Sequence, residues 1–358
     1  MKALITAGGQ GTRLRPITYT INKHLFPIAN KPMIFHALEK VAAAGVKEVG
    51  ININEGDKEL PSVVGSGKKF GVKITYLEQK GGALGLAHII KNAADWIGKD
   101  DLLFYLGDNI VSADLKSLID KFYREKLDCL LTLSKVRDPK RFGVPIIKKN
   151  RITKVEEKPQ NPKSDFAVTG IYVYRPVIIE ATKKIKSSKR GEFEISDAHT
   201  YLINKGCKVG YEEITGWWKD TGKPEDLLEG NSLILNTLRG YDVPFKNLKE
   251  EWKIEGAVKV GKGTKFKGNV VLRGPVVIGE NCIIEDSCID PYTSIGDRVE
   301  ISKTEVSHSI VCDDVKIKDC GVRIVDSLLG RNSIVKAQGH TLPSGHKLII
   351  GDNAQVEL

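Results

Sequence analysis

The sequence lacks the features that mark membrane proteins and disulfide-rich secreted proteins. No apolar run approaches the ~20 residues that a membrane-spanning helix needs, and the first residues do not resemble a signal peptide. The cysteines form no CxxC pair and have no spacing typical of a metal site; they lie at positions 129, 207, 282, 288, 312 and 320. We therefore expect a cytoplasmic protein with reduced thiols and no membrane partner.

A dense run of positive charge is also missing. The net charge is +10, but the lysines and arginines are spread along the 358 residues rather than gathered into a nucleic-acid-binding arm. We therefore expect no nucleic acid partner and attribute the charge to anionic small substrates. The apolar fraction of 41% is that of an ordinary globular protein, and the length favours two domains.

Glycines and cations follow the first predicted strand, which is the apolar run Lys2–Ala7. They are Gly8, Gly9, Gly11, Arg13, Arg15 and Lys23. Glycines let backbone N–H groups approach an anion closely, so the pattern favours a polyphosphate cradle. A tight turn with solvated arginines is the alternative. The loop is neither a Walker A motif nor a dinucleotide fingerprint, because Leu14 stands where the latter needs a glycine.

Strands and helices alternate from residue 1 to about residue 109. Strand-like runs at 3–7, 48–52, 73–77 and 102–106 are separated by helix-like segments at 32–44, 57–65 and 85–96. This alternation predicts a doubly wound α/β sheet, which binds ligands at the carboxyl ends of its strands. Asp108 follows the last of these strands. A carboxylate there can hold Mg²⁺, although a plain turn residue is the alternative.

A six-residue period begins near residue 254. Aliphatic or aromatic residues recur at Val260, Phe266, Leu272, Ile278, Ile284, Ile289, Ile295, Ile301, Val311, Ile317, Leu329 and Val335, with a one-residue slip at Ile289. This hexapeptide repeat is the sequence mark of a parallel β-helix, in which one such residue fills the interior at each flat face. We expect a catalytic domain at residues 1–240, a linker at 241–253 and the β-helix at 254–358.

Two stretches identify a resemblance to a known family. AGGQGTRLRPIT, residues 7–18, and NKHLFPIANKPMI, residues 22–34, resemble the signature of the sugar-phosphate nucleotidyltransferases, and most closely the long-form glucose-1-phosphate thymidylyltransferases. The resemblance implies a Rossmann-like catalytic domain followed by a left-handed β-helix. It also implies a Mg²⁺-dependent reaction of a nucleoside triphosphate with a sugar 1-phosphate. In that reaction the sugar phosphate attacks the α-phosphate in line, giving dTDP-glucose and pyrophosphate.

The resemblance also assigns site residues. Arg13 and Lys23 would be catalytic, and Asp108 and Asp220 would hold the metal. The nucleotide would be bound by Gly8, Gly9, Gly11, Thr12, Arg13, Gln79 and Gly85. The sugar phosphate would be bound by Gly143, Glu157, Lys158, Val168, Gly170, Arg190 and Trp218. Taken alone, each of these has a simpler interpretation as a turn, a solvated charge or a core residue. The chain departs from the family at His24, where glutamine is common, and at residues 79–83, which lack a proline and are one residue longer than usual.

Other functions fit some of these features. A uridylyltransferase making UDP-glucose would keep the chemistry and change the base. An acyltransferase would use the β-helix, and a non-catalytic sensor would bind nucleotide sugars. We expect the β-helix to assemble a homo-oligomer, because every chemical residue precedes position 225. Apolar residues outside the six-residue register would then lie on its faces, as at Val258, Val271, Val277 and Ile283.

Overall fold

The computed structural model describes residues 1–9, 11–244 and 250–337. Its contacts divide the chain into two units. The α/β unit contains Met1–Gln10, Asn22–His24 and Met33–Asp220. The β-helix unit contains Gly11–Ile21, Leu25–Pro32 and Thr221–Leu358. Much of the glycine-rich signature therefore groups with the β-helix.

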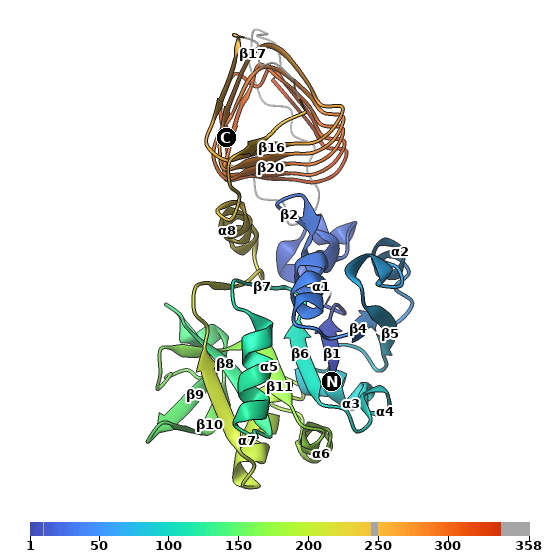
Figure 1. Cartoon of the computed structure of the whole chain (residues 1–358), viewed down its shortest axis with the longest axis vertical. Helices are drawn as coiled ribbons and strands as arrows, with labels where there is room; N and C mark the ends of the chain where they lie inside the picture. The colour runs from blue at the N-terminus through green and yellow to red at the C-terminus, as the bar shows by residue number, and fades with distance from the viewer. Residues whose placement is uncertain (10, 245–249, 338–358) are drawn as a thin grey trace. The chain divides into compact units, whose positions relative to one another are not determined.

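A nine-stranded sheet forms the centre of the α/β unit (Figure 1). Four strands run parallel in the order β5-β4-β1-β6, and β11 pairs antiparallel with β6. Beyond β11 the sheet continues into β8 and β12 and into the β9–β10 hairpin. The strands are β1 (Lys2–Thr6), β4 (Glu48–Asn54), β5 (Lys73–Gln79), β6 (Leu102–Leu106), β8 (Cys129–Lys135), β9 (Gly143–Lys148), β10 (Arg151–Glu157), β11 (Phe166–Tyr174) and β12 (Val209–Glu213). The predicted α/β alternation is confirmed.

Helices connect these strands. They are α1 (Met33–Ala43), α2 (Glu59–Val64), α3 (Leu86–Asn92), α4 (Ala94–Ile97), α5 (Leu115–Arg124), α6 (Val177–Lys184) and α7 (Ile195–Asn204), with short 3-10 helices η4 (Lys68–Phe70) and η5 (Pro139–Arg141). The helix expected over 85–96 is divided at Ala93, whose φ of −86° and ψ of 2° interrupt it. Pro32, expected in the first turn of a helix, instead ends the short strand β3 (Lys31–Pro32).

Protonation of the buried His199 should make the fold sensitive to acid. Burial lowers the pKa of His199 from 6.5 to about 3, and its Nε2 lies 2.6 Å from the Tyr174 hydroxyl. The unfolded chain takes up this proton near pH 6.5, whereas the folded chain does not until about pH 3. The neutral, buried His199 therefore favours the folded state fully above pH 6.5. As the pH falls, the free energy of unfolding decreases, and the loss from His199 reaches about 3 kcal/mol at pH 4.

Urea unfolding at pH 7 and pH 4 tests this prediction. The free energy of unfolding should drop in the wild type, and His199→Gln should show a clearly smaller drop because glutamine does not titrate in this range. An equal drop in both proteins would contradict the assignment to His199.

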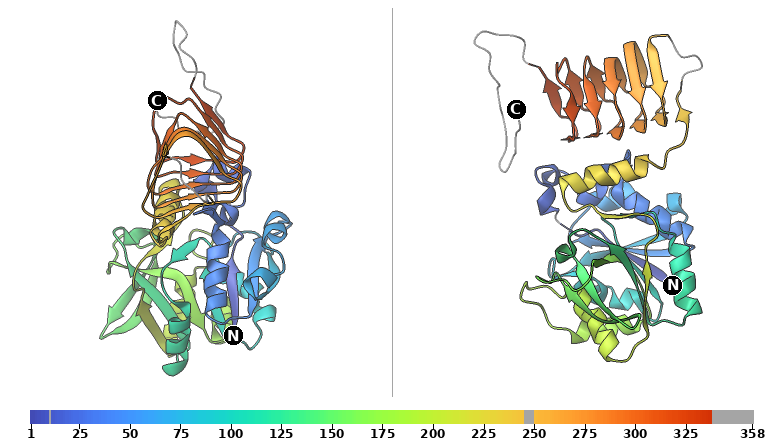
Figure 2. Two further views of the ribbon diagram at one scale, coloured as in Figure 1. Left: turned by 45° about the horizontal axis from the view of Figure 1, so that its top comes forward. Right: turned by 90° about the vertical axis from the view of Figure 1, so that its left-hand side faces the viewer.

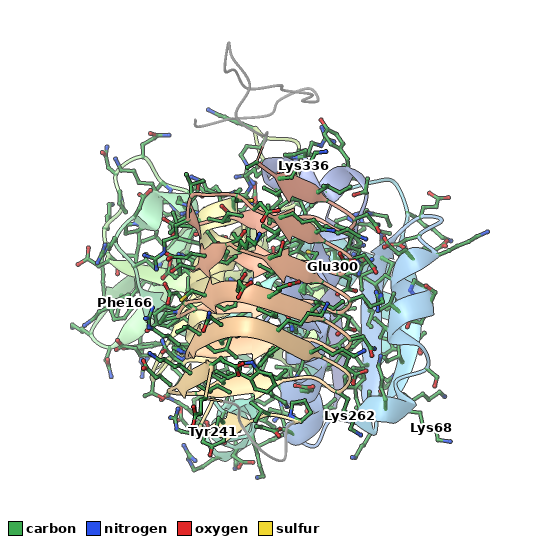
Figure 3. The ribbon with its side chains drawn as sticks, turned by 90° about the horizontal axis from the view of Figure 1, so that it is seen from above. Lys68, Phe166, Tyr241, Lys262, Glu300 and Lys336 are labelled. Carbon is green, nitrogen blue, oxygen red and sulfur yellow. The ribbon has the colours of Figure 1, made fainter. Side chains whose placement is uncertain are left out.

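The β-helix is three-sided when seen along its axis (Figure 1), and its strands stack as parallel layers (Figures 2 and 3). One sheet contains β14 (Tyr241–Asp242), β16 (Val258–Val260), β18 (Val276–Ile278), β20 (Thr293–Ile295), β23 (Ile310–Val311) and β26 (Leu328–Leu329). The other contains β15 (Trp252–Glu255), β17 (Lys265–Arg273), β19 (Ile283–Ile289), β21 (Glu300–Ser302), β22 (Glu305–Ser307), β24 (Lys316–Lys318), β25 (Ile324–Val325) and β27 (Ile334–Lys336). β14 and the first two residues of β15 lie in the segment 241–253 that we expected to be a linker.

The strand register explains the six-residue period. Val258 pairs with Val276, 18 positions on, whereas Ile283 pairs with Glu300, 17 positions on. A coil of three hexapeptides has 18 residues, and a coil one residue shorter produces the slip at Ile289. The repeat positions from Val260 to Ile317 are at most 6% exposed, which confirms them as the interior. Val258, expected on an outer face, is 1% exposed and belongs to the same core, so that expectation is wrong.

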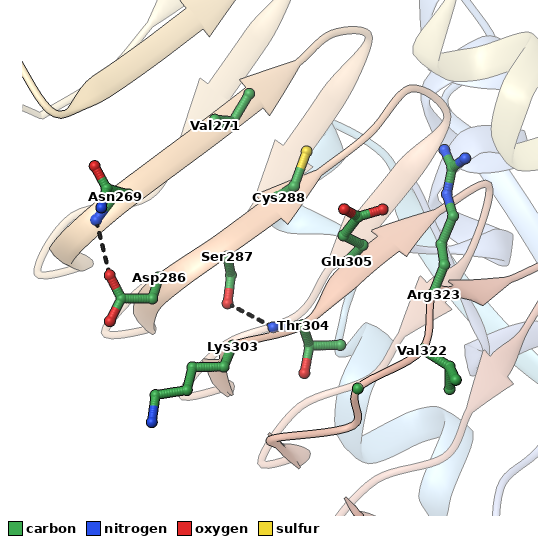
Figure 4. A pocket seen from close by; sticks show the side chains of 11 residues that line it. Asn269, Val271, Asp286, Ser287, Cys288, Lys303, Thr304, Glu305, Val322 and Arg323 are labelled. Carbon is green, nitrogen blue, oxygen red and sulfur yellow. Dashed lines mark hydrogen bonds between the residues drawn. The ribbon is translucent and has the colours of Figure 1, made fainter.

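A groove of about 630 Å³ lies on the β-helix surface (Figure 4). Asp286 accepts a hydrogen bond from the Asn269 N–H at 3.0 Å, and the Ser287 hydroxyl accepts one from the Thr304 N–H at 3.2 Å. These side chains therefore join successive coils. Burial raises the pKa of the Cys288 thiol in this groove to about 11, so the thiol stays protonated at neutral pH.

A buried amide joins three parts of the β-helix unit. Helix α8 (Pro224–Leu235) carries Asn231, which is fully buried. Its Oδ1 accepts hydrogen bonds from the Ala29 N–H at 2.8 Å and the Ser294 hydroxyl at 2.9 Å, and its Nδ2 donates to the Tyr292 carbonyl at 3.0 Å. Ala29 lies in the turn between β2 (Pro27–Ile28) and β3, so this hairpin is anchored to a β-helix coil through α8.

No helix in the described part of the chain is long and apolar enough to cross a membrane.

Candidate functional site

A buried ion pair lies at the carboxyl ends of two parallel strands. Lys23, in the 3-10 helix η3 (Lys23–Leu25), places its Nζ 2.5 Å from Oδ2 of Asp108, and the lysine side chain is only 6% exposed. Asp108 follows β6 through Gly107, whose N–H donates to the Thr6 carbonyl at 3.1 Å. A Cβ at position 107 would lie 2.3 Å from that carbonyl oxygen, so only glycine fits here.

The charges around this pair keep Asp108 ionised. Burial alone would raise the pKa of Asp108, but the Lys23 ammonium and the hydrogen bonds from Lys23 and Asn109 hold the pKa well below its ordinary value. The neighbouring His24 is neutral at pH 7, because burial, aided by Lys23, lowers its pKa to about 4. His24 contacts Asn22 rather than a ligand position: its Nδ1 lies 3.1 Å from the Asn22 Oδ1. Its departure from the family residue is therefore accommodated structurally.

A short strand pair brings together the two residues predicted to bind metal. β7 (Asn109–Val111) pairs antiparallel with β13 (Trp218–Asp220), and the register sets Asp220 opposite Asn109, the neighbour of Asp108. Within the described residues no group of three or more His, Cys, Asp or Glu side chains could hold a metal. Two carboxylates nevertheless fit Mg²⁺, which usually takes one or two carboxylates and completes its shell with water and phosphate oxygens.

Several residues predicted for the sugar phosphate cluster around Glu157. Ser196, at the start of α7, donates to the Glu157 Oε2 at 2.6 Å. A Cβ on Gly143 would lie 2.7 Å from the Ser196 Oγ, so the glycine leaves room for this bond, and Val168 is the register partner of Gly143. A Cβ on Gly170 would clash with Leu106 at 2.6 Å, so close packing between β11 and β6 also requires glycine there.

Trp218 stands beside this cluster. Its Nε1 donates to the Asn109 Oδ1 at 2.6 Å, and its ring meets Phe142 edge-on with centroids 5.3 Å apart. The tryptophan is half-buried. It therefore joins the Phe142–Gly143 segment to the strand that follows Asp108.

The two cations predicted for the sugar phosphate differ in their surroundings. Lys158 is exposed, and its N–H donates to the Phe142 carbonyl at 2.9 Å. Arg190 forms ion pairs with Glu192 at 2.8 Å and with Glu194 at 3.3 Å. Arg190 must therefore exchange carboxylates for a phosphate if it binds one.

The predicted nucleotide residues fall in both units. Gly8 follows β1 and approaches Gln79, at the end of β5; a Cβ on Gly8 would lie 3.1 Å from the Gln79 Oε1. Gly85 lies against the Arg190 loop, because the Phe193 N–H donates to the Leu84 carbonyl at 2.7 Å. Gly9 follows Gly8 in the α/β unit. In the β-helix unit, Thr12 and the exposed Arg13 lie in the 3-10 helix η1 (Thr12–Leu14), capped by Gly11, and η2 (Ile17–Tyr19) follows.

Sequence reasoning missed three polar residues that the site uses. Ser196 and Asn52 are 2% exposed and hydrogen bond to Glu157 and Gln79, and Asn109 receives the Trp218 bond. Asn109 lies inside the LGDNI motif and could have been found there. Ser196 and Asn52 carry no motif, and only the folded chain shows their partners.

The family model described as nucleotidyl transferase matches residues 2–237. The chain belongs to this family and is a nucleotidyltransferase, so the resemblance read from the sequence is confirmed.

Individual relatives indicate which nucleotidyltransferases the chain is similar to. The chain is 41% identical to a glucose-1-phosphate thymidylyltransferase of Streptomyces antibioticus, over 100% of this chain and 99% of the relative. A structure from Bacillus anthracis, provisionally named a glucose-1-phosphate thymidylyltransferase and solved with sucrose, is 38% identical with a TM-score of 0.62, covering 69% of this chain and 98% of that one. A UDP-glucose pyrophosphorylase bound to UDP-glucose is 25% identical with a TM-score of 0.58, covering 66% of this chain and 98% of that one.

Proposed function

We propose that this nucleotidyltransferase joins dTTP and glucose 1-phosphate to give dTDP-glucose and pyrophosphate. The observation that carries the proposal is the buried Lys23–Asp108 pair at the carboxyl ends of β1 and β6, with Asp220 on the adjacent strand. The full-length similarity to a thymidylyltransferase favours dTTP over UTP.

The chemistry is a single displacement at the α-phosphorus. A sugar phosphate oxygen attacks, and pyrophosphate leaves with its bonding electrons, so no side chain becomes covalently attached. Lys23 lies between the two reacting phosphates and offsets their repulsion, and Arg13 stabilises the charge on the leaving phosphates. Asp108 and Asp220 would hold Mg²⁺, whose charge offsets that of the α-phosphate when it is bound.

Specific side chains would orient the sugar phosphate. Glu157, fixed by Ser196, accepts hydrogen bonds from sugar hydroxyls. Lys158 and Arg190 bind the phosphate, and Trp218 forms one wall. Glu192 and Glu194 pair with Arg190, and the sugar phosphate would replace one or both of these carboxylates at the guanidinium when it binds.

We also propose how the enzyme is organised in the cell. Residues 1–240 perform the chemistry, and the β-helix at 254–358 assembles copies of the chain in the cytoplasm. Exposed apolar side chains in the described part of the β-helix unit support assembly: Tyr241, Val322, Val325 and Ile334 are 49–71% exposed. Free thiols at all six cysteines suit a reducing compartment.

Pyrophosphate release, assayed across four nucleoside triphosphates and several sugar 1-phosphates, tests the proposed function. We expect the highest kcat/KM with dTTP and glucose 1-phosphate. A higher value with UTP would make the enzyme a uridylyltransferase. Absence of release with every pair would support the acyltransferase or sensor alternatives.

Substitutions at Lys158 and Arg190 should affect one substrate more than the other. Lys158→Ala and Arg190→Ala each remove a charge-assisted contact, so KM for the sugar 1-phosphate should rise by about 10-fold or more. KM for dTTP should change much less. Lys163→Ala, on a nearby loop, is the control for loss of surface charge. Equal changes in both KM values would contradict the assignment of Lys158 and Arg190 to the sugar phosphate.

A further inference from the structure

Two buried amides meet at the carboxyl ends of β4 and β5. The Nδ2 of Asn52 donates to the Oε1 of Gln79 at 3.1 Å. The side chains are 2% and 5% exposed. Gly8, in the predicted phosphate-binding loop, lies against this pair, because a Cβ on Gly8 would lie 2.7 Å from the Asn52 Nδ2. The Gln79 amide is therefore held by a neighbour rather than rotating in solvent.

The hydrogen bond from Asn52 orients the Gln79 amide relative to a bound nucleobase. Its oxygen is engaged by Asn52, whereas its Nε2 has no hydrogen-bond partner within the described residues. An amide nitrogen carries two donors and no acceptor. Held in this orientation, Gln79 offers a base the two donors of its nitrogen, while its oxygen keeps one of its two lone pairs.

We propose that Asn52 is a positioning residue that sets base selectivity by fixing the Gln79 amide with its nitrogen towards the nucleobase. The inference rests on the proposed function and on the assignment of Gln79 to nucleotide binding, which we take here to be contact with the pyrimidine base. Thymine and uracil carry a carbonyl acceptor at C4, which matches a donor. Cytosine carries an amino donor there, and two facing donors leave buried polar groups unpaired, which is strongly unfavourable.

Reversing the direction of the Asn52–Gln79 hydrogen bond should therefore reduce the preference for dTTP over dCTP. In Asn52→Asp the ionised carboxylate can only accept, so Gln79 must turn its nitrogen to Asp and its oxygen to the base. The ratio of kcat/KM for dTTP to that for dCTP should fall by about 10²-fold at pH 8, where the new carboxylate is ionised. In Asn52→Leu the amide is no longer held, and the ratio should fall by about 10-fold. KM for glucose 1-phosphate should stay constant in both variants.

Asn54→Asp is the matched control. It adds the same charge on the same strand, near Gly8; Asn54 is the strand register partner of Gln79, but among the described residues its side chain makes no hydrogen bond to the Gln79 amide. Its dTTP to dCTP ratio should match the wild type. If Asn52→Asp does not fold, Asn52→Leu provides the test. A lower dTTP to dCTP ratio of kcat/KM in Asn52→Leu supports the proposal, and an unchanged ratio overturns it. An unchanged ratio in a folded Asn52→Asp protein also overturns it.

Binding separates this inference from the proposed function. The Kd values of dTTP and dCTP are measured by calorimetry in the wild type and all three variants. If the wild type binds dTTP but transfers it to no sugar phosphate, the proposed function fails while the Kd ratios still judge Asn52. If transfer occurs and the Kd ratios do not respond to Asn52, only the role of Asn52 fails.

Discussion

Replacing Lys23 with methionine should lower kcat by about 10³-fold. The ammonium would offset the repulsion between two phosphates as the sugar phosphate approaches, and removing one preorganised charge of this kind costs about 10²–10³ in turnover. The substitution also leaves the largely buried Asp108 without its partner, so the free energy of unfolding should fall by about 3 kcal/mol. Steady-state kinetics and urea unfolding measure the two effects separately.

The double variant Lys23→Met with Asp108→Asn is the control for stability. It removes both charges, so the free energy of unfolding should recover most of the loss while turnover stays low. Arg13→Ala, at an exposed position in η1, should lower kcat by about 10²-fold with no loss of stability. Near-wild-type turnover in Lys23→Met would show that the ion pair is structural only.

Asp108→Asn should reduce activity by about 10³-fold or more. The amide removes the charge that makes this strand end attractive to a hard cation, and it also weakens the hold on Lys23. Excess Mg²⁺ should restore activity only in part. Paramagnetic resonance of Mn²⁺, used as a probe, should show weaker binding in Asp108→Asn and Asp220→Asn than in the wild type.

Asp114→Asn is the matched control for that measurement. Asp114 caps α5 by accepting from the Lys116 N–H at 3.0 Å and takes no part in the site. It should bind Mn²⁺ as the wild type does and lose only a little stability. Full activity of the wild type in EDTA, or Mn²⁺ binding unaffected at Asp108 and Asp220, would remove the case for a metal at these carboxylates.

The β-helix was predictable because its signal is local and repeated. Each interior position returns after six residues, so Ile278, Ile284 and Ile295 could be placed in the core without knowing their partners. The side of a coil on which Val258 points depends on where the strand bends relative to the repeat. No period fixes that, and Val258 was misplaced for this reason.

Some residues predicted for the site come together where a motif marks them. Lys23, Asp108 and Asp220 each lie in a recognisable stretch, and the structure pairs Lys23 with Asp108 and sets Asp220 beside that pair. Ser196 and Asn52 could not be found from the sequence, because a lone serine on α7 or a lone asparagine on β4 gains its meaning only from the partner that folding brings.

The β-helix unit also makes contacts within its own chain, beside any part that it takes in assembly. Asn231 and Ser294 anchor the turn at Ala29, only a few residues after Lys23. The β-helix therefore braces the hairpin that follows the signature lysine, in addition to any part in assembly.

An isotope experiment tests the central claim most directly, namely that an oxygen of the sugar phosphate attacks the α-phosphorus. Glucose 1-phosphate labelled with ¹⁸O at its non-bridging phosphate oxygens is incubated with dTTP, and the products are examined by ³¹P NMR and mass spectrometry. The account predicts that dTDP-glucose keeps all the label, with one ¹⁸O shifting both phosphorus resonances from the bridge, and that pyrophosphate carries none. An unlabelled bridge, or label in pyrophosphate, would contradict it.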